Sequence, residues 1–139
     1  MCSKNHADAD LVLVPFSSPG VSSSLASGVN AHQGFLGAYN SVANSVISTV
    51  KSQLKKYPSY SLISTGHSLG AALASLGGVS LASNFPNSKL RVFTYGQPRT
   101  GDPGYAALAE KLIGSGNLYR AVHTYGKRKP SVYLFPPAF

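Results

Sequence analysis

One serine in this sequence has a glycine two positions away on either side. Gly66, Ser68 and Gly70 fit the pattern G-x-S-x-G, between the apolar segment YSLIST and the small-residue run LGAALASLGGVSLA. This pattern marks a sharp turn from a strand into a helix, which exposes the serine oxygen above a sheet. Glycine is expected on both sides because backbone and the following helix come close there. The sequence therefore predicts that Ser68 is a nucleophile.

Two further residues, His67 and Leu69, complete the turn. The N-terminus of the helix predicted to begin at Leu69 offers unpaired amides and positive dipole potential to a developing oxyanion. The Leu69 amide is the natural first donor. His67 is adjacent to Ser68 and cannot easily swing back to its hydroxyl group, so we interpret it as a packing or hydrogen-bonding residue.

Hydrophobic periodicity and turn signals predict the elements that hold this turn. The predicted strands are residues 10–14, 60–65, 90–95 and 118–125, and the predicted helices are 37–57, 69–82 and 103–113. The strand DLVLV is expected to be buried and to end at Pro15. Alternation of strands and helices is typical of an α/β protein with a mostly parallel sheet.

Composition limits the classes of function. The 139 residues include 12 Lys and Arg but only four Asp and Glu, which gives a net charge of +8, and 43% are hydrophobic. These values fit one globular domain. The bases are dispersed, which favours a solvated surface, although an anionic lipid surface remains a possible partner. Bases and aromatics do not interleave as a nucleic-acid groove requires.

Several kinds of site and segment are not expected. A single cysteine, Cys2, allows no disulfide within the chain, and four dispersed histidines give no metal-ligand spacing. We therefore expect neither a metal nor another cofactor. The first residues lack the basic segment and apolar core of a signal peptide, and nothing approaches a membrane span of about 20 apolar residues.

Five segments of the chain carry a family resemblance: GHSLGAALASL, YSLIST, FTYGQPRTGDPGY, AHQGFLGAYNSV and YRAVHTY. Together they resemble the fungal class 3 lipases, a triacylglycerol lipase family, over about residues 8–125. The resemblance implies a partial α/β-hydrolase fold with a mostly parallel sheet and flanking helices. It also implies hydrolysis of acylglycerol esters through a Ser-His-Asp triad, with Ser68 as nucleophile and the Leu69 amide in the oxyanion hole. Members of this family are usually secreted.

The sequence departs from the family pattern at both ends. Gly126 stands where the family has its catalytic Asp, in a segment like H-x-x-D-x-V-P that begins here at His123. The family's catalytic His lies beyond Phe139, and the loop with its second oxyanion donor lies before residue 8. We therefore divide the chain into a truncated lipase-like domain, residues 1–126, and a basic, proline-rich tail, residues 127–139. A frameshift or splice junction near Gly126 is one hypothesis for this change.

A substitute triad is one alternative, because Ser68, Asp102 and His123 occur in the hydrolase order of nucleophile, acid and base. Asp102 before Pro103 also fits a helix N-cap, and His123 fits a packed residue at a strand end. His32, in AHQGF, is expected to pack beneath the site.

The sequence thus predicts a lipase-family ester hydrolase with very weak or no activity. The alternatives are a non-catalytic module that binds lipid surfaces or other partners, and a fragment that does not fold alone. The location is extracellular if an N-terminal segment is missing and cytoplasmic otherwise. The oligomeric state is not indicated.

Overall fold

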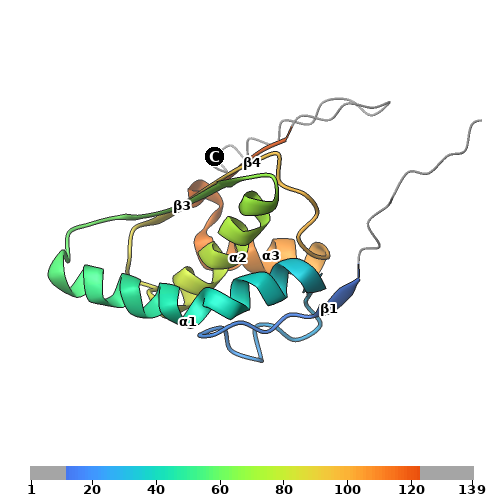
Figure 1. Ribbon diagram of the computed structural model, residues 1–139, viewed down its shortest axis with the longest axis horizontal. Helices are drawn as coiled ribbons and strands as arrows, with labels where there is room; N and C mark the ends of the chain where they lie inside the picture. Colours follow the sequence, from blue (N-terminus) through green and yellow to red (C-terminus); the bar gives the residue numbers. More distant parts are fainter. Residues whose placement is uncertain (1–11, 123–139) are drawn as a thin grey trace, which may run out of the picture.

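A three-stranded parallel sheet lies along one side of the fold, with the helices on its other side (Figure 1). The computed structural model describes residues 12–122, so His123, the predicted boundary at Gly126 and the tail lie outside the described residues. The strand order is β3-β4-β5. The strands and their connecting helices are β3 (Leu62–His67), α2 (Leu69–Asn84), β4 (Leu90–Tyr95), α3 (Pro103–Ile113) and β5 (Leu118–Ala121), with a short 3-10 turn, η1 (Ser115–Asn117), before β5. The predicted α/β class with flanking helices is confirmed.

The N-terminal part of the fold differs from the prediction. The first strand, β1 (Leu13–Pro15), pairs antiparallel with an unpredicted strand, β2 (Asn30–His32), in a separate two-stranded sheet. Leu13 and Pro15 are exposed, so the expectation of a buried strand is wrong, although the strand does end at Pro15. Pro15 is tolerated because an edge strand does not need every N–H group.

The long helix α1 (Gln33–Lys56) begins four residues earlier than predicted. Its N-cap is His32, whose Nδ1 accepts a hydrogen bond from the Phe35 amide at 3.4 Å. Histidine is uncommon at this position, where Ser, Thr, Asp and Asn are preferred. The end of the helix agrees better with the sequence, because Tyr57 is the C-cap and Pro58 follows it.

Helix α2 is the core of the molecule. Every residue from Ala71 to Ala82 except Leu73 is buried, and Leu76 and Val79 are fully enclosed. A helix that is apolar on all sides is expected inside a protein rather than on its surface. Its small residues allow close packing on the sheet: a Cβ atom added at Gly78 would lie 2.6 Å from Val92 Cγ2 of β4.

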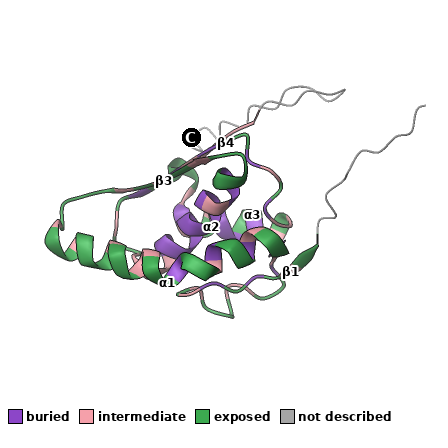
Figure 2. Ribbon diagram, in the orientation of Figure 1, coloured by how far each residue is buried: buried purple, intermediate pink, exposed green. Residues whose placement is uncertain are grey.

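All three helices lie on one side of the sheet (Figures 1 and 2). Side chains on the helical side of β4 are buried, namely Leu90, Val92 and Thr94, and Ser64 Oγ of β3 donates to the Ala74 carbonyl of α2 at 2.8 Å. The alternate residues on the other face of β3 are exposed. The sheet is therefore packed on one face only within residues 12–122.

Asp102 links the start of α3 to β2 through hydrogen bonds. Its carboxylate accepts hydrogen bonds from the Tyr105 amide at 2.8 Å and from the Asn30 amide and Nδ2 at 3.0 and 2.8 Å. Partial burial raises the pKa of Asp102, but these hydrogen bonds together outweigh burial and lower the pKa below its ordinary value. The predicted N-cap at Asp102, with proline at the first helical position, is confirmed.

We expect Asp102→Ala to lower the free energy of unfolding by about 1–3 kcal/mol at neutral pH, because a cap is lost and Asn30 donors lose their acceptor. The folded-state pKa lies below the unfolded value of about 3.9, so this stabilisation is present above that value and disappears as the pH falls through the folded pKa. Urea unfolding at neutral and acid pH measures the difference. Glu110→Ala, elsewhere on α3, is the control; an equal loss at both pH values would exclude a role for the charge.

Gly78→Ala is expected to lower the free energy of unfolding by about 1–3 kcal/mol, because the added methyl group overlaps Val92. Gly37→Ala is the matched control on α1, where an added Cβ meets nothing within 4 Å. That change should raise stability by about 0.5–1 kcal/mol through helix propensity. Urea denaturation of both variants gives the comparison, and similar effects at both positions would contradict the close packing of α2.

Candidate active site

Ser68 has a strained backbone at the junction of β3 and α2. Its φ of 53° and ψ of −123° make it the one non-glycine residue with positive φ among residues 12–122. Such conformations cost about 1–3 kcal/mol and persist only where the surrounding structure enforces them. Two backbone contacts do so here: the Ser68 amide donates to the Tyr95 carbonyl at 2.9 Å, and the Ser68 carbonyl accepts from the Ala71 amide at 3.0 Å.

The hydroxyl group of Ser68 is exposed and does not cap the helix. Ser68 occupies the N-cap position of α2, where a serine side chain ordinarily accepts a hydrogen bond from the first turn, but its side chain makes no such bond. The residue is exposed, so its side chain can be reached from solvent.

The two flanking glycines have different roles. A Cβ at Gly66 would overlap the backbone carbonyl of Gly70, so the first turn of α2 lies against the end of β3. A Cβ at Gly70 would meet nothing within 4 Å. The predicted steric need for glycine thus holds at Gly66 but is wrong at Gly70 in the described part of the chain.

Leu69 is the first residue of α2, and its side chain is 54% exposed beside Ser68. The first amides of a helix have no partner within the helix, and they carry the positive end of its dipole. The Leu69 amide belongs to this first turn, directly after Ser68.

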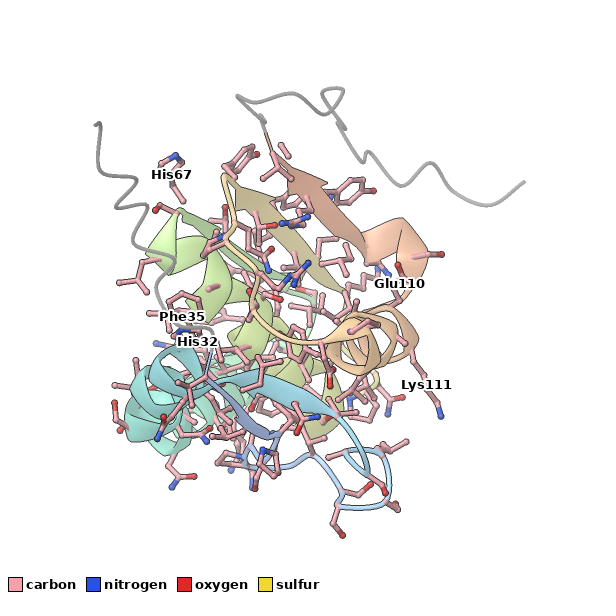
Figure 3. The ribbon with its side chains drawn as sticks, turned by 90° about the vertical axis from the view of Figure 1, so that its right-hand side faces the viewer. His32, Phe35, His67, Glu110 and Lys111 are labelled. Carbon is pink, nitrogen blue, oxygen red and sulfur yellow. The ribbon has the colours of Figure 1, made fainter. Side chains whose placement is uncertain are left out.

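The histidines of the described chain lie apart (Figure 3). His67 is exposed at the end of β3, and its Nε2 lies 3.4 Å from the position that a Cβ of Gly96 would occupy. His32 lies at the start of α1, where its ring stacks on Phe35 with centroids 4.2 Å apart. Its Nδ1 is occupied by the cap described above. Neither environment suggests a base directed at the Ser68 hydroxyl group.

Asp102 lies in a different local environment from Ser68. It lines a pocket of about 340 Å³ with Tyr105, Glu110 and Arg120, and Ser68 is not among the lining residues. Its carboxylate is already occupied by Asn30 and Tyr105. His123, the third member of the substitute triad, lies outside the described residues, so that triad stays a hypothesis.

Sequence reasoning missed the residues that hold the loop after β4. The Gly96 amide, in a residue with φ of +57°, donates to the Ala121 carbonyl of β5 at 2.7 Å. Arg120 Nη2 donates to the Gln97 carbonyl at 2.9 Å, and burial lowers the pKa of its guanidinium. The sequence did offer a signal for the Gly96 contact, because a glycine follows the strand predicted at residues 90–95. It offered none for the Arg120 contact, which joins residues 23 positions apart.

No group of three or more His, Cys, Asp and Glu side chains in residues 12–122 could hold a metal ion. Over the same residues, no helix is long and apolar enough to cross a bilayer.

We expect Gly66→Ala to lower the free energy of unfolding by about 2 kcal/mol or more, because the methyl group and the Gly70 carbonyl cannot share one position. Gly70→Ala should change it by less than about 1 kcal/mol, since the space is open. Urea unfolding of the two variants tests the asymmetry of the turn. Equal destabilisation would show that both flanking positions are crowded.

Comparison with known proteins identifies the family. The sequence matches the family described as Lipase (class 3) over residues 4–125. It is 42% identical over 134 residues to a lipase of Rhizomucor miehei, covering 94% of this chain and 34% of that protein. It is 37% identical over 101 residues to the secreted mono- and diacylglycerol lipase A of Penicillium cyclopium, covering 72% of this chain and 32% of that protein.

Solved lipases share the fold. A triacylglycerol lipase from Penicillium expansum superposes with a TM-score of 0.76 at 30% identity, over 88% of this chain and 47% of that one. The Rhizomucor miehei lipase in its propeptide complex gives a TM-score of 0.66 at 42% identity, over 83% of this chain and 36% of that one. The chain spans about a third of the length of the two relatives compared by sequence. With a partial α/β-hydrolase fold and a strained serine turn, this chain belongs to the class 3 lipase family.

Proposed function

We propose that this chain carries the nucleophile of a carboxylic ester hydrolase that acts on acylglycerols. Ser68 Oγ attacks the ester carbonyl carbon, and the Leu69 N–H stabilises the resulting oxyanion. The observation that carries the proposal is the backbone of Ser68, which bears positive φ and leaves the hydroxyl group exposed at a helix N-terminus. Strained backbone of this kind clusters at functional sites, where the surrounding structure enforces it.

The substrate class follows from the relatives. Their names describe lipases of triacylglycerols and of mono- and diacylglycerols, and their chains are about two to three times longer than the matched part. We extend acylglycerol hydrolysis to this chain on that basis. One of these relatives is described as secreted, so we also propose an extracellular location for the protein.

The rate of the proposed hydrolysis depends on a base that activates Ser68. A serine hydroxyl group is a weak nucleophile until a base takes its proton. His32 caps α1 and His67 lies beside the nucleophile, so neither is a base for Ser68, and Asp102 is occupied at α3. We therefore propose slow turnover for the chain alone, with His123, the histidine of the substitute triad, as the base to test. Loss of triad members elsewhere leaves roughly 10³ to 10⁴-fold catalysis over water.

A fluorophosphonate probe tests the nucleophile directly, because it forms a phosphorus–oxygen bond to an activated serine and releases fluoride. We expect one adduct by intact mass on the native chain, and none on Ser68→Ala or on the chain in urea. Ser61→Ala, at another exposed serine, is the matched control and should be labelled like the unchanged chain. Labelling that persists in Ser68→Ala would assign the reactivity elsewhere.

The same assay tests the substitute triad. Asp102→Ala should be labelled at the rate of the unchanged chain under conditions where both are folded, since its carboxylate serves the cap. His123→Ala measured in parallel decides the base: slower labelling assigns that role to His123, and an unchanged rate excludes it. A tributyrin hydrolysis assay on the same variants connects labelling with turnover.

A further inference from the structure

The conformation of Ser68 depends on the group that holds its amide. The Ser68 amide donates to the Tyr95 carbonyl at 2.9 Å. Because His67 of β3 lies beside Tyr95 of β4 in the register, this bond extends the contact between the two strands one residue beyond β3. A strained backbone conformation persists only while its surroundings enforce it. The residues that fix the Tyr95 carbonyl therefore also fix the serine turn.

The chain turns sharply directly after Tyr95. Gly96 has a φ of +57°, and its amide donates to the Ala121 carbonyl at 2.7 Å. Glycine adopts this φ without steric cost, but it also leaves the backbone more freedom than any other residue does. A second contact beyond Gly96 is needed to restrict that freedom. Arg120 of β5 provides it, because its Nη2 donates to the Gln97 carbonyl at 2.9 Å.

Arg120 lies on the helical side of the sheet. It is the register neighbour of Thr94, which is buried beneath the helices, and neighbouring residues of paired strands point to the same face. With Gln97 and Tyr105, it lines the 340 Å³ pocket described above. Partial burial lowers the pKa of its guanidinium. Removing a cation from water costs free energy, and the charge-assisted bond to the Gln97 carbonyl offsets part of that cost.

The loop after β4, residues 96–101, is held from both sides. The Gln97 side chain is buried and its Nε2 donates to Thr100 Oγ1 at 2.8 Å. The Thr100 carbonyl in turn accepts from the His32 amide at 2.8 Å, which ties the far end of the loop to β2. Among residues 12–122, Arg120 donates the one side-chain hydrogen bond that reaches this loop from another element.

We propose that Arg120 is a positioning residue for the nucleophile. By holding the Gln97 carbonyl, it keeps the Tyr95 carbonyl in place for the Ser68 amide. Arg120 acts through the loop and does not contact the substrate. Its effect on reaction rate rests on the proposed function, whereas its effect on the Ser68 amide does not require any reactivity.

Arg120→Met tests the proposal, because it removes the donor and keeps an unbranched side chain. Hydrogen exchange of the Ser68 amide should become about tenfold faster or more relative to that of the Leu76 amide, deep in α2, since the opening is local. Fluorophosphonate labelling of Ser68 should become about tenfold slower or more, as misplacement of a reacting group costs rate. The loss should fall on the maximal labelling rate and leave the half-saturating probe concentration unchanged.

Arg99→Met is the matched control. Arg99 has the same charge on the same loop, but it is exposed. This change should alter both the exchange ratio and the labelling rate by less than about threefold, as surface substitutions usually do. Arg120→Lys, which keeps a charged donor on a flexible stem, should recover part of the labelling rate and of the amide protection.

Three outcomes would overturn the proposal. Equal acceleration of exchange at Ser68 and Leu76 would reduce the role of Arg120 to overall stability. Equal slowing in Arg99→Met would assign the effect to net charge. Exchange and labelling that both stay unchanged in Arg120→Met would exclude the positioning role. If the unchanged chain is not labelled at all, the proposed function fails, and the exchange ratio alone still decides whether Arg120 positions the serine turn.

Discussion

The contact between the first turn of α2 and the end of β3 is the constraint on which the site depends. With the Gly70 carbonyl occupying the position of a Gly66 side chain, the strand turns into the helix within one residue. That residue is Ser68, and its positive φ is the geometric consequence. The Ser68 side chain makes no capping hydrogen bond, and the residue is exposed. Backbone packing, more than any side-chain hydrogen bond in the described residues, therefore sets the conformation of this turn.

Hydrogen bonds extend this constraint across the sheet. Ser68 donates to the Tyr95 carbonyl at the end of β4, and the next amide, that of Gly96, donates to Ala121 at the end of β5. The three strand ends are thus joined in a line. Arg120 adds a second link by holding the Gln97 carbonyl. Because active sites of open α/β sheets gather at the carboxyl ends of the strands, this line defines the edge at which substrate would meet the fold.

Local signals predicted the middle of the chain well, and tertiary contacts explain the differences. Strand β4 and helix α3 begin and end where the sequence indicated, because turn residues bound the strand and a capping Asp with a following Pro starts the helix. The start of α1 was missed because His32 caps it, and histidine is a weak capping signal. DLVLV has the composition of a buried strand, yet β1 pairs with β2 at the surface. Apolar composition alone does not indicate which sheet a short strand joins.

The candidate site also combines features that local sequence predicts with features that depend on tertiary contacts. The G-x-S-x-G spacing predicted the sharp turn, because neighbouring residues determine such a turn. It gave a wrong reason for Gly70, since crowding depends on what approaches the turn from elsewhere in the fold. The bond between Arg120 and Gln97 likewise joins residues that no local pattern connects.

The burial of α2 also decides how the molecule opens. Amides exchange their hydrogens with solvent through local opening where few contacts hold an element, and only through global unfolding where an element is enclosed. Residues 71–82 are enclosed almost completely, whereas the two short strands β1 and β2 form a separate ladder of three residue pairs. The ladder can open while α2 remains closed. The serine turn joins β3 to this enclosed helix, but its own residues 67–70 are exposed, so it lies at the boundary between the two kinds of opening.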